Sequence, residues 1–266
     1  MRLRIDFSYD GTNFFGWAKQ PGLHTVQGTL DVALATVLRL DTIQSTVAGR
    51  TDAGVHATGQ TAHVDVDDSV KPERLQRQLN SILAGGAIHV HRVTIAPPGF
   101  DARYSPLFRR YEYRVSDAVG NRDPRTRHIT FWVDNHLDIE LMNAAATSIL
   151  GLHDWTTYCK PRPRATRVRE LQIFRWRRDD DGTLVAQVQA DAFCHNMVRN
   201  LVGMCIAVGR GKLSVSDAVT LRAERTRTSA FIVIPPHGLT LVEVGYPADD
   251  EMGNRAESSR ARREPV

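Results

Sequence analysis

Apolar and polar residues alternate at the start of the chain. Every second residue from Leu3 to Tyr9 is apolar, and Asp10-Gly11 then supplies a turn. A period of two is typical of a strand with one buried face. The pattern therefore predicts a strand that ends at Tyr9.

The rest of the first half predicts two helices and three further strands. Thr25 can cap a helix whose apolar residues recur at helical spacing, and Pro72 opens a second such helix. Strands are predicted over residues 43–48, 61–66 and 88–95. The order β-α-β-β-α-β is that of the split βαβ arrangement.

The second half follows the turn residues Pro97-Pro98-Gly99 and again mixes strands with helices. Residues 179–182 separate two apolar segments and indicate a hairpin. The predicted elements are strands over 110–115, 130–133, 171–177, 184–190 and 239–246, and helices over 139–150, over 197–208 and after Ser214.

These elements predict an α+β protein of two halves, residues 1–103 and 104–247, with a boundary near Arg103. We expect the two sheets to join edge to edge into one continuous, mostly antiparallel sheet with flanking helices. Residues 248–266 are charged, poor in aromatic residues and aperiodic, so we predict that this tail is disordered.

Composition excludes some classes of protein. A chain of 266 residues with 42% hydrophobic content can bury a core, which excludes a mostly disordered protein. The formal charge is +4, and only four of the 34 basic residues are lysines. Arginine suits phosphates and base edges, but a solvated arginine-rich surface produces the same composition.

No charged leader followed by an apolar segment and no run of about 18 apolar residues occurs, so we expect neither secretion nor a membrane span.

The cysteines point to a reducing environment. Cys159, Cys194 and Cys205 are odd in number, lack CxxC spacing and have no paired histidine motif nearby. We therefore predict neither a disulfide framework nor a zinc site, and we expect a cytoplasmic protein.

Residues 49–60, GRTDAGVHATGQ, place a carboxylate, a guanidinium and an imidazole in a loop with several glycines. Glycine lets a backbone turn tightly or approach a ligand, and functional residues concentrate in such loops. Asp52 could instead only hydrogen-bond the backbone, with Arg50 and His56 in solvent. However, a guanidinium two positions away would keep a partly buried carboxylate ionised. We expect His56 to be a structural, hydrogen-bonded residue.

Several other segments accompany this loop in a fixed order. They are YDGTNFFGW at 9–17, TVQG at 25–28, FDAR at 100–103, RRYEY at 109–113, MVRN at 197–200, and Gly238-Leu239 leading to Tyr246-Pro247. With these segments the chain resembles the tRNA pseudouridine synthase A family over roughly residues 3–247. It departs from the family's pattern at Ala18, where glutamine is common, and at the bulky residues 231–234.

The resemblance implies a fold and a reaction. Members of the family have two α+β halves that form a continuous sheet around a basic central cleft, usually in a homodimer. They isomerise uridines 38, 39 and 40 of the tRNA anticodon arm to pseudouridine without a metal or an organic cofactor. On this basis we expect tRNA as the substrate and no cofactor.

The resemblance also implies roles for single residues. Asp52 matches the catalytic aspartate, Arg50 the arginine that helps displace the target base, and Arg199 the arginine that forms a salt bridge with the aspartate. Tyr111 matches the aromatic residue that stacks near the uracil, and Leu239 an apolar wall of the pocket.

The residue patterns alone leave alternatives open for three of these residues. Leu239 could be ordinary core, Tyr111 could be an aromatic residue packed inward from a strand, and Arg199 could extend from its helix to solvent. Tyr113, on the same strand face as Tyr111, is expected to be a packing residue.

Further arginines gather near predicted loops and strand ends, where they could follow tRNA phosphates or form a solvated charged face. They are Arg103, Arg109, Arg110, Arg162, Arg164, Arg167 and Arg169.

Breaking a glycosidic bond builds positive charge on the sugar. A carboxylate beside C1′ could stabilise that charge, attack the sugar or remove a sugar proton, and the sequence does not choose among these roles. Two other functions stay open. A non-catalytic RNA-binding protein could use split βαβ halves, although the RNP aromatic signature is absent, and a base-removing hydrolase could use the same carboxylate.

Overall fold

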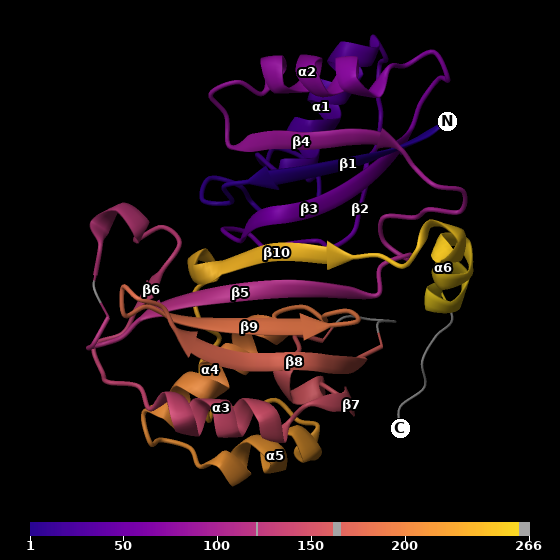
Figure 1. Cartoon of the computed structure of the whole chain (residues 1–266). Helices are drawn as coiled ribbons and strands as arrows, with labels where there is room; N and C mark the ends of the chain where they lie inside the picture. The colour runs from indigo at the N-terminus through magenta and orange to yellow at the C-terminus, as the bar shows by residue number, and fades with distance from the viewer. Residues whose placement is uncertain (121, 162–165, 261–266) are drawn as a thin grey trace. The chain divides into compact units, whose positions relative to one another are not determined.

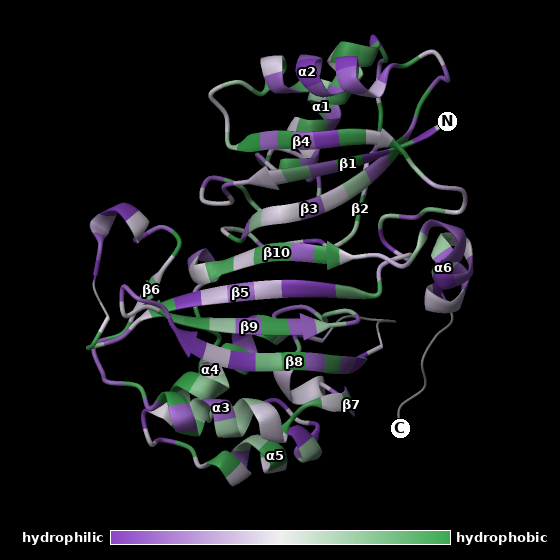
Figure 2. Cartoon of the chain, in the orientation of Figure 1, coloured by the Kyte–Doolittle hydropathy of each residue, from purple (hydrophilic) through white to green (hydrophobic). Residues whose placement is uncertain are grey.

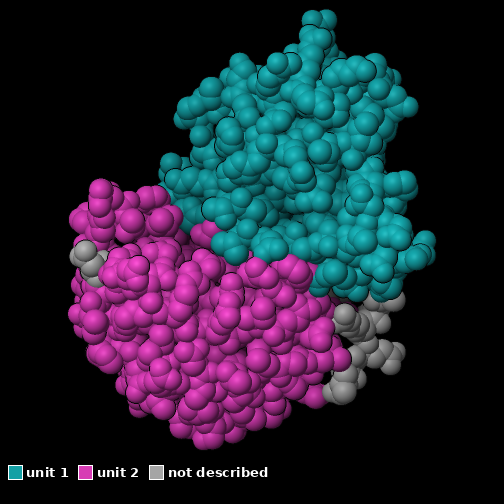
Figure 3. Space-filling model, in the orientation of Figure 1, with its two compact units in different colours: residues 1–107, 241–261 teal, residues 108–240, 262–266 magenta. Residues whose placement is uncertain are grey.

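The chain is described from a computed structural model, which covers residues 1–120, 122–161 and 166–260. These residues form two compact units (Figure 3). Unit 1 combines residues 1–107 with 241–260, and unit 2 contains residues 108–240. The predicted boundary near Arg103 lies four residues before this division, and the chain returns to unit 1 after residue 240.

Unit 1 is a mostly antiparallel sheet with helices packed on it (Figure 1). Its strands pair in the order β4-β1-β3, and both β2 and β10 pair with β3. Its elements are β1 (Arg2–Tyr9), α1 (Val26–Leu38), β2 (Thr46–Val47), β3 (His56–Asp65), α2 (Pro72–Ile82), β4 (Ile88–Ile95), η4 (Asp249–Glu251) and α6 (Met252–Arg260). Strand β10 (Leu239–Gly245) runs across the division between the units.

Local signals place β1, α1 and α2 where the sequence predicts them, whereas β2 is shorter than predicted and β3 begins at His56, before the predicted strand. The apolar residues of β1 from Leu3 to Tyr9 are buried, and the intervening residues are half-buried. The Thr25 side chain accepts a hydrogen bond from Gly28 N at 3.2 Å and caps α1, and Pro72 opens α2. Strand β1 is antiparallel to both β3 and β4, as the split βαβ arrangement requires.

Unit 2 repeats this order of strands. Its sheet runs β5-β9-β8-β7, so β5, β9 and β8 take the places of β1, β3 and β2, and the short strand β6 pairs with β5 in parallel. Its elements are β5 (Phe108–Ser116), η1 (Pro124–Thr126), β6 (Phe131–Trp132), α3 (Ile139–Ser148), β7 (Gly151–Asp154), η2 (Thr156–Tyr158), β8 (Val168–Arg178), β9 (Leu184–Ala190), α4 (Met197–Gly209), α5 (Val215–Glu224) and η3 (Pro236–Gly238).

Helix α4 is almost entirely buried, and α3 packs against α4, α5 and β8. The predicted hairpin joins β8 to β9 through a turn in which Asp179 N donates to Thr183 O at 2.9 Å. Ser214 caps α5 in a reciprocal capping box with Asp217. Each of these local signals is confirmed. Strand β7, by contrast, was not predicted.

The tail differs from its prediction of disorder. Residues 249–260 form η4 and α6, and most residues of this segment are hydrophilic (Figure 2). Met252 and Ala256 recur at helical spacing and are buried, and Met252 packs on Phe100 and Ala102. Two apolar residues are too weak a periodic signal to be recognised in a polar segment, but they suffice to dock one short helix. Residues 261–266 lie outside the described part of the chain.

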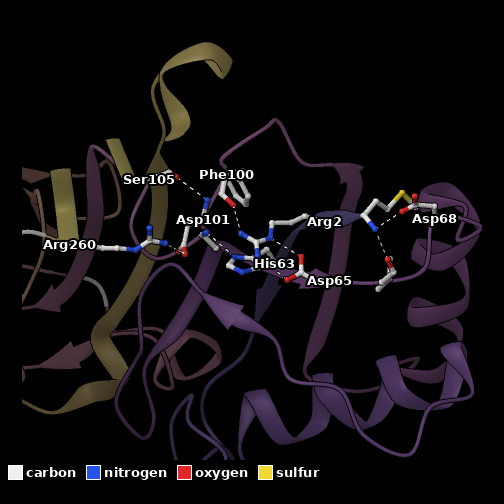
Figure 4. A network of polar contacts seen from close by, with 11 residues as sticks. Arg2, His63, Asp65, Asp68, Phe100, Asp101, Ser105 and Arg260 are labelled. Carbon is white, nitrogen blue, oxygen red and sulfur yellow. Dashed lines mark hydrogen bonds and ion pairs between the residues drawn. The ribbon is translucent and has the colours of Figure 1, made fainter. Parts of the chain in front are cut away.

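A polar network ties the segment after β4 to the sheet of unit 1 (Figure 4). Arg2 makes two hydrogen bonds of 2.8 Å to Asp65 and one of 2.7 Å to Phe100 O. His63 Nδ1 accepts from Ala102 N at 3.0 Å, which requires the neutral ring, and burial lowers the pKa of His63. Arg260 of α6 donates to Asp101 at 3.2 Å. The network therefore holds both the end of the first half and the tail helix.

Candidate active site

The predicted catalytic loop, residues 49–60, lies in unit 1. Its residues 49–55 join β2 to β3, whereas residues 56–60 already belong to β3. Asp52 is half-buried there and Arg50 is exposed. The loop backbone is bonded to the 9–17 segment, because Trp17 N donates to Thr51 O at 3.0 Å and Gly54 N donates to Phe14 O at 3.3 Å. The two segments that carry most of the family resemblance are therefore in direct contact.

Two glycines make this contact possible. A Cβ atom on Gly11 would lie 2.0 Å from Val55 O, so any other residue would push the loop away. Gly16 has φ +86°, and a Cβ atom there would lie 3.0 Å from Thr51 O. The requirement for glycine at both positions comes from the close approach of two backbones, and no pattern within either segment alone reveals it.

A buried hydrogen-bond network lies beneath the loop. The Tyr9 hydroxyl and Thr51 Oγ1 are 2.7 Å apart, and Gln60 Nε2 donates to Tyr9 Oη at 3.3 Å and to Gly49 O at 2.9 Å. Burial raises the pKa of Tyr9 to about 12, so its hydroxyl stays protonated. No residue pattern in the sequence predicted a role for these three residues. The available signal was their place in the two motif segments.

His56 has the structural role expected of it. It is buried, and its Nδ1 accepts a hydrogen bond from Gly11 N at 3.1 Å, which requires the proton to be on Nε2. The Asp10 carboxylate lies at the same distance from Nδ1 and forms an ion pair only when the ring is protonated. His56 thus holds the start of β3 to the Asp10-Gly11 turn.

Tyr111 and Tyr113 lie on the buried face of β5 in unit 2. The Tyr111 ring makes an edge contact with Phe193 at a centroid distance of 5.2 Å. Tyr113 is fully buried and donates its hydroxyl to Pro235 O at 2.8 Å, which confirms its predicted packing role. A Cβ atom on Gly238 would lie 2.7 Å from the Tyr113 ring, so Tyr113 also sets the backbone just before Leu239.

The segment 191–196 organises the predicted residues of unit 2. Arg109 is buried and donates to Asp191 O at 2.7 Å. Phe193 meets Tyr111, and Asn196 Oδ1 accepts a long hydrogen bond of 3.5 Å from Arg199. Three of the predicted site residues therefore share contacts with one loop, which the sequence analysis did not single out.

The remaining predicted residues of the site are placed as follows. Arg199 Nε donates to Ile234 O at 2.7 Å, so its guanidinium is held within unit 2 and does not simply extend to solvent. Leu239 is buried at the start of β10. Arg110 donates to Gln189 at 2.9 Å, and its guanidinium lies 5.1 Å from the Phe108 ring centroid.

Of the other predicted RNA-binding arginines, Arg103 is exposed and lies 5.1 Å from the Tyr104 ring centroid. Arg167 and Arg169 donate to the side chains of Thr156 and Thr166. Arg162 and Arg164 lie outside the described residues.

Asp52 and Arg50 belong to unit 1, whereas Tyr111, Arg199 and Leu239 belong to unit 2. The salt bridge between Asp52 and Arg199 stays a prediction.

The pairing of the cysteines differs from the prediction. Cys159 and Cys194 are joined as a disulfide with a Cα–Cα distance of 5.8 Å, although no disulfide was predicted. The fold brings the end of η2 beside the 191–196 segment, where Lys160 N donates to His195 O at 2.9 Å. Because 35 positions separate the two cysteines, their spacing carries no signal. Cys205 is buried and free, and burial raises the pKa of its thiol to about 12.

The described residues offer neither a metal-binding cluster nor a helix that could cross a membrane. No group of three or more His, Cys, Asp or Glu side chains is placed there to hold a metal ion. Among the same residues, the helices are all too short or too polar to cross a membrane.

Comparison with known proteins identifies the family. The family model described as tRNA pseudouridine synthase matches residues 7–105 and 145–247. A tRNA pseudouridine synthase A from Leifsonia xyli subsp. xyli is 54% identical over 280 residues, covering 98% of this chain and 97% of that protein. The chain belongs to the tRNA pseudouridine synthase family. A second synthase of the same description, from Frankia casuarinae, is 49% identical over 265 residues, covering 100% of this chain and 96% of that protein.

The ranges matched by the synthase family model contain Asp52, Arg199 and Leu239, whereas Tyr111 lies between the two ranges. Among solved structures, the archaeal box H/ACA sRNP Nop10–Cbf5 complex aligns with 77% of this chain and 44% of the matched chain. The identity is 11% and the TM-score is 0.33.

The cysteine pair predicts a thiol count for this synthase. Alkylation of the purified protein, denatured without reductant, should block one thiol, that of Cys205, whereas alkylation after reduction should block three. Intact-mass spectrometry measures the difference, and the Cys159→Ser variant is the control, because it should show two free thiols without reductant. Three free thiols in the unreduced protein would contradict the pairing.

Proposed function

We propose that this synthase isomerises uridines 38, 39 and 40 of the tRNA anticodon arm to pseudouridine, with Asp52 as the catalytic carboxylate. Family membership supports the reaction. The observation that carries the assignment of Asp52 is its position in a half-buried loop that the 9–17 segment and a buried network hold in place. The target uridine would reach Asp52 as a base flipped out of the RNA stack, and unstacking it costs a few kcal/mol.

The chemistry needs one carboxylate and a dry site. The N1–C1′ bond breaks with its electron pair on N1, the uracil turns, and a new bond forms from C5 to C1′. The C5 hydrogen leaves as a proton, and N1 takes up a proton. Asp52 would stabilise the developing charge at C1′, attack the sugar or remove a sugar proton. Hydrolytic glycosidases pair two carboxylates to activate water, whereas a rearrangement requires that water be excluded.

The other site residues have proposed roles around Asp52. Arg50, which is exposed beside it, would take the place of the flipped base in the RNA. Tyr111 would stack near the uracil or accept the C5 proton, and Leu239 would form an apolar wall. Arg199 would pair with Asp52, which needs the two units to face each other across a basic cleft and their sheets to be continuous. These roles follow the family pattern.

The first prediction concerns Asp52. The Asp52→Asn variant should lose about 10³-fold or more of its activity, because the amide cannot attack the sugar, accept its proton or neutralise its charge, while tRNA binding stays within twofold. Tritium release from tRNA that carries 5-tritiated uridine measures the reaction, since joining uracil through C5 must expel that hydrogen. The exposed Asp41→Asn variant is the matched control and should keep normal activity.

The same assay separates the other two functions. A non-catalytic RNA-binding protein would release no tritium even as the wild type. A base-removing hydrolase would liberate free uracil and leave its C5 hydrogen in place. Tritium release at the wild-type rate from Asp52→Asn would show that another group carries the chemistry.

We propose that Arg103, Arg109 and Arg110 contact tRNA, with the more accessible Arg103 and Arg110 meeting phosphates. Arg110→Gln should weaken tRNA binding and reduce the slope of log K against log salt by roughly 0.7–0.9 for each phosphate that the variant no longer neutralises. Binding titrations between about 50 and 200 mM salt measure the slope, because phosphate contacts lose much of their affinity over this range. Arg77→Gln, on the exposed face of α2, is the control, and an equal change in its slope would contradict the assignment.

We also propose a cytoplasmic homodimer, following the family and the location of its tRNA substrate. Light scattering at micromolar concentration tests the oligomeric state. A single species of 29.7 kDa would contradict the dimer.

A further inference from the structure

We propose that Tyr9, Thr51 and Gln60 form a positioning network that sets the direction in which Arg50 and Asp52 leave the catalytic loop. The inference rests on the proposed function, because it takes Asp52 as the catalytic carboxylate. None of the three residues would touch the substrate. Each would act through the backbone that carries Arg50 and Asp52.

The network holds the loop on both sides of Arg50. Gln60 Nε2 donates to Gly49 O at 2.9 Å, which fixes the residue before Arg50. The Tyr9 hydroxyl bonds Thr51 Oγ1 at 2.7 Å, which fixes the residue after it. Gln60 also reaches Tyr9 Oη at 3.3 Å, so the two attachments share one side chain. The exposed arginine therefore projects from a backbone whose two neighbouring residues are both hydrogen-bonded to the network.

The same contacts constrain Asp52 from the preceding residue. Thr51 is held by its side chain through Tyr9 and by its carbonyl oxygen through Trp17 N at 3.0 Å. Beyond Asp52 the turn closes where Val55 N donates to Asp52 O at 3.2 Å. The backbone is therefore hydrogen-bonded on both sides of the Asp52 side chain. A carboxylate that must meet C1′ within a fraction of an ångström needs such a support.

One hydrogen-bond direction in the network is fixed by its donor. Gln60 Nε2 can only donate, so Tyr9 Oη accepts from it, whereas either oxygen can be the donor in the 2.7 Å bond between the Tyr9 and Thr51 hydroxyls. Burial raises the pKa of Tyr9 to about 12, which keeps its hydroxyl protonated near neutral pH. The network therefore does not lose this proton there, as a fixed support requires.

The burial of these three polar side chains supports a role in positioning the loop. The exposed fractions are 4% for Tyr9, 7% for Thr51 and 0% for Gln60. Buried polar side chains cost free energy unless every partner is present, and an apolar set of the same shape would pack at least as well. What an apolar set could not do is bond Gly49 O and the Thr51 side chain in one defined geometry.

The test uses substitutions that remove single hydroxyl groups. Tyr9→Phe and Thr51→Val should each lower kcat for tritium release about 10- to 100-fold, with KM and the tRNA dissociation constant within twofold. Thr51→Ser keeps the hydroxyl and should recover most of the loss. Tyr158→Phe is the matched control. It removes another fully buried hydroxyl, which donates to Ala218 O at 3.3 Å in unit 2, and it should leave kcat unchanged.

The possible outcomes separate the inference from the proposed function. Wild-type kcat in folded Tyr9→Phe and Thr51→Val, while Asp52→Asn is inactive, would overturn the network and leave the proposed function intact. Activity in Asp52→Asn would overturn the function itself. An equal loss of kcat in Tyr158→Phe, or a parallel loss of tRNA binding, would mean that the network only stabilises the fold. If Tyr9→Phe fails to fold, the comparison of Thr51→Val with Thr51→Ser decides.

Discussion

The structure depends on the close approach of two backbones in unit 1. Gly11 and Gly16 allow the 9–17 segment to contact the loop that carries Asp52, because a side chain at either position would meet Val55 O or Thr51 O. Main-chain hydrogen bonds then hold the loop, and His56, the first residue of β3, bonds the Asp10-Gly11 turn. An acidic residue in a free loop would lose conformational entropy in every reaction cycle. Here that entropy is lost once, during folding.

In unit 2 the proposed site residues are held by a different segment. Residues 191–196 follow β9 and contact Arg109, Tyr111 and Arg199, and the Cys159–Cys194 pair ties the segment to the end of η2. Arg109 is buried against this segment, which makes it a support as well as a proposed RNA contact. In both units a loop bonded to a segment distant in sequence holds proposed site residues. The loop of unit 1 carries them, whereas the loop of unit 2 contacts them from β5 and α4.

Local chemistry made most of the fold predictable. Capping at Thr25 and Ser214, the proline that opens α2 and the turn at 179–182 act within a few residues, so a pattern reveals them. The failures have a different cause. Strand β2 is shorter than predicted, β7 is a short edge strand, and α6 is ordered by its contact with Phe100. Each depends on a partner that lies far away along the chain.

The sequence by itself determined the succession of strands and helices, the split βαβ order of the first half, the family, and the loop that contains Asp52. Those properties reside in short-range periodicity or in motif strings. Only the tertiary structure decided that the glycines of one motif admit the backbone of the other, that Tyr9 and Gln60 support Thr51, and that Cys159 meets Cys194. Such contacts join residues dozens of positions apart, and their distances arise only when the sheet has brought the segments together.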